Sequence, residues 1–478
     1  MDTILYWNEV ALEANRVSHT DGKDTGTLGP TLSTRALAIV HLAMYDAYAG
    51  AVKDPANLPP YLTNLPTPAA GASPAAAVAA AAHATLSQLH PSQKTFFDLK
   101  KSQADEESHG PGFGDGQAFG LIVAQRILDD RKNDPDAKDT GYTPSLARGA
   151  HRPDPNNPDQ GFHAPFYGAK SKCFAVTARH QLEAPPRPGG PEYRQALKEV
   201  RGKGIAPELM GTLLPTSLLP RTVDEALIGI YWAYDGVAGI GTPPRLYNQI
   251  VRALAIARNN SVAENARLFA LVNVAMADAG ILAWDQKYIH DFWRPVVAIR
   301  EHDKSMGPAA TLGSNDILND CDPLWLPLGS PKSNAVAKNF TPPFPAYPSG
   351  HATFGAAAFH ITRLFYGVAN FGPDNLFDGL TFVSDEWNGH NKDNAGAVRP
   401  RHVRSFPGGL WQMIEENCRS RVYLGVHWLF DSFVIDDNDR PNLARNIGGL
   451  PLGLKIAEDI FNGGRAKGLK KSNVGPRT

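Results

Sequence analysis

Two cations and several aromatic residues share one short segment in the C-terminal half of the chain, residues 284–295 (WDQKYIHDFWRP). Lys287 and Arg294 are seven residues apart, so a helix would carry both on nearly the same face, about 10 Å apart along its axis. Two cations among aromatic side chains could hold an anion in a partly apolar site. The simpler alternative is a solvated helix face on which the cations pair with Asp285 and Asp291.

A Pro-rich segment that ends in Ser-Gly-His, residues 342–351, precedes a helical pattern of apolar residues. The free N–H groups at the start of such a helix point toward one spot and suit an oxyanion. Ser349 and Gly350 would stand at this N-terminus, and His351 in the first turn could exchange protons with the anion. The alternative is that Ser349 only caps the helix and His351 is an incidental polar residue.

A third segment, residues 420–431 (SRVYLGVHWLFD), combines a cation, a histidine and a carboxylate. Arg421 and His427 are six residues apart and do not share a helix face, but Gly425 between them could break the helix and redirect His427. Asp431, four residues after His427, could hold one tautomer of the imidazole. Two alternatives stay open: a buried histidine with satisfied hydrogen bonds, and half of a divalent-metal site that has no evident third ligand.

The elements that must position these residues are predicted to be helices, because apolar residues recur at helical spacing and convincing alternating strands are nearly absent. The helical stretches are 33–45 with Ser33 as the cap, 76–89, 116–130, 223–235, 244–258, 262–281, 350–366 and 408–424. Stretches rich in Pro, Gly, Asp or Asn are expected to be surface connections or an extended insertion. They are residues 52–75, 108–116, 147–168 and 184–192. The sequence therefore predicts an all-α fold of helical bundles with long loops.

The composition narrows the classes of function. The chain has 478 residues, 42% hydrophobic and 20% charged, as in ordinary soluble globular proteins. With 47 Lys and Arg against 48 Asp and Glu, the formal net charge is −1, so no overall basic field indicates a nucleic-acid partner. The most apolar stretch, residues 76–89, is too short for a membrane span, and we expect no membrane partner. An anion site must therefore come from a local cluster of cations.

The cysteines and the N-terminus give weaker constraints. Three cysteines, Cys173, Cys321 and Cys418, exclude a dense disulfide framework and a four-cysteine zinc site, while one disulfide stays open. The N-terminus lacks a basic region followed by an apolar core, so we predict no signal peptide and a cytoplasmic location, with a secreted or periplasmic location left open. The basic tail from Gly463 is expected to be frayed.

In chain order the three segments spell K-x6-R-P, P-S-G-H and S-R-x5-H. Together they are the signature of the superfamily that unites vanadium-dependent haloperoxidases with type 2 phosphatidic acid phosphatases and class A bacterial acid phosphatases. Within it the chain resembles the vanadium-dependent haloperoxidases, most closely those of the fungal chloroperoxidase type. The resemblance covers most of the chain, including residues 6–17, 232–236 and 241–251, and is weakest over about 135–200.

This resemblance implies a bound vanadate, an oxyanion shaped like phosphate, in a site that phosphate or another oxyanion could also occupy. His427 would ligate vanadium, and His351 would act as acid and base. The vanadate oxygens would be bound by Lys287, Arg294, Ser349, Gly350 and Arg421. Asp235 matches the family acid that pairs with Arg421. That Asp431 orients His427 is our own inference from the spacing.

The implied activity is the oxidation of halide by hydrogen peroxide to hypohalous acid, which halogenates a small organic acceptor. Lys287 would polarise the peroxide and His351 would take its proton. Phe344, seven residues before His351, and Trp284, three before Lys287, match the chloroperoxidase pattern and would form an apolar wall that partly removes water from a halide. We therefore expect oxidation of chloride and bromide. The acceptor and the oligomeric state, a homo-oligomer included, stay open.

The same motifs also suit an acid phosphatase with His427 as nucleophile, forming a phosphohistidine, and His351 protonating the leaving group. A phosphate-binding scaffold without turnover is the non-enzymatic alternative, although no motif residue is missing. The resemblance further implies two four-helix bundles, one chiefly from each half. We divide the chain into an N-terminal helical half with a loop-rich insertion, residues 1–215, and a C-terminal bundle that carries the vanadate site, residues 216–478.

Overall fold

The computed structural model of the protein describes residues 2–211, 218–301, 322–463 and 469–477. Over these residues the fold is mostly α-helical, which confirms the predicted class, and it contains one short antiparallel sheet. The α-helices are α1 (Thr3–Asp21), α2 (Gly29–Val52), α3 (Pro74–Leu89), α4 (Lys94–Ser108), α5 (Phe113–Arg131), α6 (Tyr167–Lys170), α7 (Pro191–Lys203), α8 (Val223–Tyr231), α9 (Pro243–Ala257), α10 (Val262–His290), α11 (Pro295–Glu301), α12 (Gly350–Phe365), α13 (Gly409–Tyr423) and α14 (Gly449–Gly463). The strands are β1 (Thr381–Phe382) and β2 (Arg404–Ser405).

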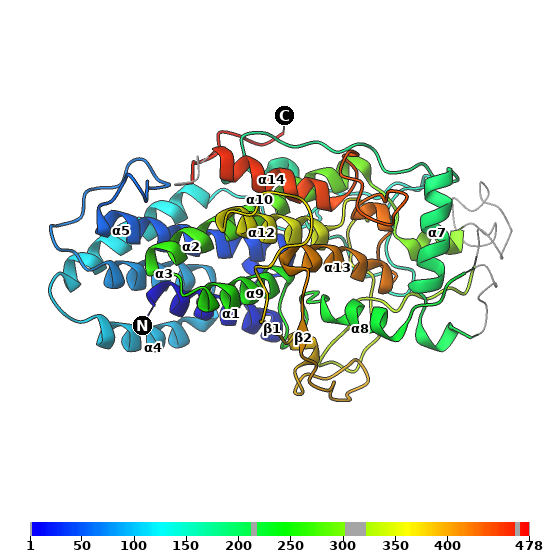
Figure 1. Cartoon of the computed structure of the whole chain (residues 1–478), viewed down its shortest axis with the longest axis horizontal. Helices are drawn as coiled ribbons and strands as arrows, with labels where there is room; N and C mark the ends of the chain where they lie inside the picture. Colours follow the sequence, from blue (N-terminus) through cyan, green and yellow to red (C-terminus); the bar gives the residue numbers. More distant parts are fainter. Residues whose placement is uncertain (1, 212–217, 302–321, 464–468, 478) are drawn as a thin grey trace.

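The long helix α10 lies at the centre of the molecule. It packs against α2 on one side and against α12 and α14 on another, and Figure 1 shows it running between the α3–α5 end and the α7–α8 end of an elongated molecule. Ser261 and Glu264 form a capping box at its start. Among the described residues α10 is the helix long and apolar enough to cross a membrane, and 94% of its most apolar window is buried inside the protein. A helix that is apolar on all sides is suited to such a core position.

Two groups of helices pack around α10. In the N-terminal group α2, α3 and α5 contact one another, and in the C-terminal group α12 contacts α13, α14 and α9. Glycines allow the close approach: a Cβ atom at Gly120 of α5 would overlap the carbonyl of Ala77 in α3, and one at Gly453 of α14 would lie 2.5 Å from Thr353 O in α12. One cluster of buried apolar residues runs from Ile4 to Leu469 across both groups. The expected boundary at 215/216 lies outside the described residues.

Each predicted helical stretch corresponds to an observed helix with shifted ends, and the structure contains further helices that were not predicted. Helix α2 begins at Gly29, so Ser33 lies inside the helix and does not cap it. The Ser33 hydroxyl instead donates to Thr27 O at 3.1 Å and accepts from Asn15 at 2.9 Å. Helix α4 escaped prediction because only Phe97 and Ala104 of its residues are buried, which leaves almost no apolar periodicity to detect.

The C-terminal tail does not fray over residues 469–477. Its backbone pairs with the segment before α7, since Ser472 N donates to Phe174 O at 2.8 Å and Cys173 N donates to Val474 O at 2.9 Å. Arg477 donates to Asp285 of α10 at 2.9 Å. The expectation of a frayed tail is therefore wrong for these residues, because backbone pairing and a buried carboxylate were invisible in the composition.

Asp278 of α10 ties this segment to the core. Its carboxylate accepts hydrogen bonds from the backbone N–H groups of Phe174, Ala175 and Val176 at 2.6 to 2.9 Å, and it is fully buried. We expect Asp278→Asn to lower the free energy of unfolding by about 2 to 3 kcal/mol, because the amide leaves buried N–H donors without a charged acceptor. Equilibrium unfolding in urea would measure this. The exposed Asp129→Asn is the matched control and should change stability by less than about 0.5 kcal/mol. Equal effects of the two variants would contradict the assignment.

Candidate active site

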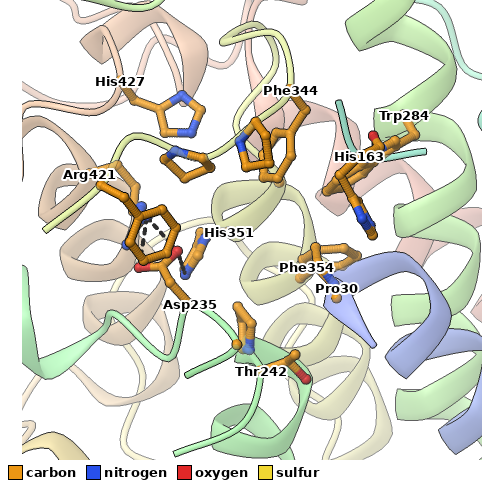
Figure 2. Close-up of a pocket in the computed structure, with 17 residues that line it drawn as sticks. Pro30, His163, Asp235, Thr242, Trp284, Phe344, His351, Phe354, Arg421 and His427 are labelled. Carbon is orange, nitrogen blue, oxygen red and sulfur yellow. Dashed lines mark hydrogen bonds and ion pairs between the residues drawn. The ribbon is translucent and has the colours of Figure 1, made fainter. Parts of the chain in front are cut away.

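A cavity of about 160 Å³ lies between α10, α12 and α13, and Trp284 of the first segment meets residues of the second and third motifs there (Figure 2). Lys287, Arg294 and Ser349 do not line this cavity and are fully buried in the surrounding structure. The first motif does not behave as its spacing suggests. Asp291 adopts a left-handed conformation (φ 46°) and its N–H bonds to Lys287 O, which ends α10 at His290. Lys287 therefore lies on the last turn, whereas Arg294 follows the helix in the connection to α11. The two cations approach the site from different backbone directions, and the prediction of a shared helix face is wrong.

The second motif forms the N-terminus of α12, as expected. The Ser349 hydroxyl accepts from Ala352 N at 3.3 Å, so Ser349 is the cap. Ser349 N donates to Asp431 O at 2.7 Å, which connects the second motif to the third. Gly350 and His351 line the cavity, and a Cβ atom at Gly350 would lie 3.2 Å from the Trp284 ring. The capping role of Ser349 thus coexists with a position at the site.

The third motif turns where the sequence suggested. Helix α13 ends at Tyr423, and Gly425 has φ 72°. A Cβ atom at Gly425 would overlap the carbonyl of Gly204, so only glycine allows this turn. After the turn His427 lies against the cavity, close to the first motif, and Asp431 follows in the short 3-10 helix η6 (Leu429–Asp431). The expected redirection of His427 is confirmed.

The hydrogen bonds of His427 determine its tautomer. Its Nε2 lies 2.9 Å from Arg294 Nη1, and its Nδ1 lies 2.7 Å from Asp431 Oδ2. Because a guanidinium group can only donate, Nε2 must accept, and the ring proton therefore stays on Nδ1 and is donated to Asp431. Burial and the nearby Arg294 hold the pKa of His427 well below its ordinary value. His427 thus presents a neutral Nε2 lone pair toward the cations.

Both arginines carry buried donors without a partner among the residues that the structure describes. Arg294 donates through Nε to Phe344 O at 2.9 Å and through Nη1 to Val426 O at 2.7 Å, but its Nη2 has no acceptor. Arg421 donates through Nη2 to Asp235 at 2.9 Å, while its Nε and Nη1 have none. The two side chains are at most 1% exposed. Each buried donor left unpaired costs about 1 to 3 kcal/mol, so this group of donors is suited to a multidentate oxyanion.

Lys287 is held more tightly than the motif implied. Its Nζ donates to the carbonyls of Pro345, Ala346 and Pro348 at 2.7, 3.2 and 2.5 Å, and lies 5.1 Å from the centre of the Phe344 ring. Burial and Arg294 lower the pKa of this ammonium group well below its usual value. All three donors therefore have backbone acceptors, and a bound oxyanion would have to replace one of them.

His351 is a neutral base in this structure. Its Nε2 lies 2.6 Å from Ala233 O and 3.7 Å from Asp235 Oδ1. A carbonyl oxygen can only accept, so the proton is on Nε2 and the Nδ1 lone pair is available for a proton. Burial and Arg421 lower the pKa of His351 to about 3. In contrast, burial raises the pKa of Asp431 to about 7, although Lys287 and Arg294 oppose the shift.

An aromatic wall faces these polar groups across the cavity. Trp284 and Phe344 have ring centres 4.8 Å apart, and Phe354 stacks on Trp284 at 6.1 Å. Figure 2 shows Trp284 and Phe354 on the side opposite Arg421 and Asp235. The wall predicted from Trp284 and Phe344 is therefore present next to the cations.

Sequence reasoning missed His163, which also lines the cavity. It comes from residues 147–168, which were expected to be a surface connection. In fact this stretch is partly in the core, because His151 is 1% and Asp154 3% exposed. No spacing or motif marked His163, since its position depends on a loop that approaches α10 and α2 only in the folded chain.

The remaining alternatives for metal and disulfide chemistry gain no support in the described part of the chain. No group of three or more His, Cys, Asp or Glu side chains there could hold a metal ion. Cys173 and Cys418 are buried free thiols, and Cys321 lies outside the described residues.

Comparisons with known proteins agree with the motifs. Family models of the vanadium chloroperoxidase N-terminal domain and of its second helical-bundle domain match residues 1–173 and 267–449. The chain is 34% identical to the vanadium chloroperoxidase of Curvularia inaequalis, over 96% of this chain and 90% of that protein. Among solved structures, a bacterial vanadium-dependent iodoperoxidase has a similar fold, with a TM-score of 0.66 at 21% identity over 95% of both chains. A bacterial vanadium-dependent chloroperoxidase has a TM-score of 0.58 at 15% identity, over 93% of this chain and 94% of that one.

We expect Asp431→Asn to weaken oxyanion binding roughly 10- to 100-fold, as for other partners that orient a ligating histidine. The amide is a weaker acceptor for His427 Nδ1 and carries no charge to balance Lys287 and Arg294. Equilibrium dialysis with orthovanadate would measure the dissociation constant. Asp437→Asn, on the exposed turn that follows, is the control and should leave the constant unchanged. An unaltered affinity in Asp431→Asn would contradict the role of this carboxylate.

Oxyanion binding should take up protons and weaken as the pH rises. In the free protein burial lowers the pKa of Lys287 well below its usual value and that of Arg294 to about 9. A bound oxyanion favours both cations and raises these pKa values. The affinity is therefore highest at a pH below the pKa values that the two cations have in the free protein. Above these pKa values it falls by at most about tenfold per pH unit for each proton taken up on binding. Calorimetric titration with tungstate between pH 7 and 9, in buffers of different ionisation enthalpy, would measure the uptake. An affinity that rises with pH would refute it.

Proposed function

The chain belongs to the vanadium chloroperoxidase family of vanadium-dependent haloperoxidases. We therefore propose that the protein binds vanadate among the buried cations and His427, a site called the cage below, and that it oxidises chloride and bromide with hydrogen peroxide. The protein is an enzyme of the haloperoxidase class, and its family implies hydrogen peroxide and halide as substrates. One hydrogen peroxide, one halide and one proton give one hypohalous acid and one water. The hypohalous acid then halogenates a small organic acceptor.

The unpaired donors of the two arginines carry this proposal. Three buried guanidinium nitrogens, one on Arg294 and two on Arg421, have no acceptor among the described residues. His427 Nε2, which accepts from Arg294 Nη1 at 2.9 Å, lies beside the first of these two side chains. A tetrahedral oxyanion supplies several acceptor oxygens and a central atom that an imidazole nitrogen can ligate. The donor set therefore fits vanadate, with His427 as the vanadium ligand and Lys287, Ser349 and Gly350 completing the cage. Bound vanadate would supply Lewis-acid activation of hydrogen peroxide, and the oxidation state of vanadium would not change.

The chain's own residues manage protons and charge. His351, neutral and with a free Nδ1 lone pair, takes the proton that hydrogen peroxide releases. Asp235 lies 2.9 Å from Arg421 and 3.7 Å from His351, so it orients the guanidinium group and stabilises the imidazolium that forms. Lys287 lies on the last turn of α10, where carbonyls of the Pro-rich segment before α12 hold its side chain, and its ammonium group polarises the bound substrate. Asp431 keeps His427 in the tautomer that leaves Nε2 unprotonated.

The aromatic wall supports oxidation of chloride as well as bromide. Trp284 and Phe344 exclude water on one side of the site, and a partly desolvated halide reacts more readily with a polarised oxygen. Phe344 lies 5.1 Å from Lys287 Nζ and 5.0 Å from the Arg294 guanidinium carbon, so the wall and the cations meet at one place.

The test is peroxide-dependent bromination and chlorination of a dimedone-type reporter by apoprotein in low phosphate, with and without added orthovanadate. We expect activity only with orthovanadate. His427→Ala should reduce the rate at least about 100-fold because the vanadium ligand is lost. His390→Ala, at an exposed site away from the cavity, is the control and should retain the activity.

Absence of halogenation in both conditions would overturn the proposal. In that case hydrolysis of p-nitrophenyl phosphate would test the acid phosphatase alternative, in which the same cage binds phosphate and His427 forms a phosphohistidine. Chlorination much slower than bromination would contradict the part assigned to the aromatic wall.

A further inference from the structure

The aromatic side of the cavity contains one polar side chain that the proposed mechanism does not use, His163. Its ring centre lies 6.0 Å from that of Trp284 and 6.1 Å from that of Phe344. Figure 2 shows it beside Trp284, across the cavity from Arg421 and Asp235. An imidazole in this position is the polar group that an ion would meet at the otherwise apolar end of the site.

The surroundings fix this ring. Nε2 lies 3.0 Å from the hydroxyl of Thr31 in the first turn of α2. Gly29, which also lines the cavity, has φ 75°, and a Cβ atom there would overlap the imidazole. The backbone carbonyl of His163 accepts from Trp284 Nε1 at 3.2 Å and from Tyr288 at 2.9 Å, so the aromatic wall and the histidine are coupled through the main chain. No hydrogen bond described in the structure uses Nδ1.

His163 is neutral, and in one of its two tautomers Nδ1 carries the ring proton and can donate to an anion. Burial lowers its pKa to about 4, so the ring is neutral in ordinary assays. The Thr31 hydroxyl can donate to Nε2, and in that arrangement the ring proton resides on Nδ1. A halide beside Nδ1 favours the same tautomer, because it can only accept.

We propose that His163 is a halide-binding residue that sets the halide preference of this enzyme, with Nδ1–H donating to a halide held against Trp284 and Phe344. The inference rests on the proposed haloperoxidase function and adds to it a residue outside the three motifs. Thr31 is a positioning residue in this scheme, because it acts on the halide only through the imidazole.

The preference follows from the cost of desolvation. Chloride is the smallest of the three halides concerned and loses the most hydration free energy on entering an apolar pocket, whereas iodide loses the least. A single N–H donor on the apolar side therefore offsets the largest desolvation cost for chloride, a smaller one for bromide and the smallest for iodide. Removal of the donor should shift the enzyme away from chloride and toward iodide.

The experiment compares His163→Leu with His163→Asn in the vanadate-loaded enzyme. Leucine removes the donor, whereas the asparagine amide nitrogen can occupy nearly the position of Nδ1 and retains it. In His163→Leu we expect KM for chloride to rise roughly ten- to a hundredfold, the loss typical of one hydrogen bond to a charged group. KM for bromide should rise less, KM for iodide should change little, and kcat should stay within about twofold. His163→Asn should recover most of the chloride KM.

Thr31→Val and Thr31→Ser provide a second pair that leaves His163 in place. Valine is nearly isosteric with threonine but cannot donate to Nε2, so the Nδ1–H tautomer loses its support and the chloride KM should rise. Serine keeps the hydroxyl and should behave as the unchanged enzyme. This pair decides the question if His163→Leu fails to fold.

Anomalous diffraction from bromide-soaked crystals gives a readout independent of turnover. We expect a bromide peak within hydrogen-bond distance of Nδ1 in the unchanged enzyme, and its loss in His163→Leu. Equal rises of KM for all three halides, an unchanged chloride KM, or bromide found only beside Arg294 and Arg421 would overturn the inference. A loss of all halide oxidation in the unchanged enzyme would instead contradict the proposed function itself.

Discussion

Burial of several cations around one small cavity is the constraint on which the rest of this structure depends. Lys287, Arg294 and Arg421 are each at most 1% exposed. Removal of an ion from water costs several kcal/mol unless partners compensate, and Asp235 supplies a carboxylate to one of the three cations only. Backbone carbonyls accept from Lys287 and Arg294, but three guanidinium nitrogens have no acceptor in the part of the chain that the structure describes. The described residues alone therefore leave this arrangement of donors unsatisfied.

This constraint explains why each motif stands at the end of a helix. Carbonyl and N–H groups inside a helix are already paired, and only the first and last turns leave some free. The first motif begins on the last turn of α10 and continues past its end, the second begins α12, and the third begins on the last turn of α13 and continues past its end. The left-handed Asp291 and Gly425 then turn the chain so that Arg294 and His427 come within 2.9 Å of each other. The ends of these helices thus bring free backbone groups and the cations to the same site.

The cavity combines two environments that a single helix could not provide. One side carries Arg421, Asp235 and the two motif histidines, and the other carries aromatic rings from α10 and from the Pro-rich segment before α12. The polar groups and the aromatic rings lie close together because α10 contributes both Lys287 and Trp284 from adjacent turns. His163 adds a polar group to the aromatic side, and it comes from a loop outside the three motifs.

The sequence by itself determined the all-α class and the three motifs, because helical periodicity and the order of rare polar motifs are local properties. Of the residues that line the cavity it named Asp235, Trp284, Phe344, Gly350, His351, Arg421 and His427. It also anticipated the turn at Gly425 and the contact between His427 and Asp431. It misjudged the helix face of Lys287 and Arg294, the cap of α2 and the order of the tail, since each depends on where a helix stops or which segment pairs with it. Only the tertiary structure revealed the unpaired guanidinium donors, the carbonyls around Lys287 and the position of His163. Burial and hydrogen-bond satisfaction arise between segments that are 50 to 186 residues apart in the chain, so no local pattern can encode them.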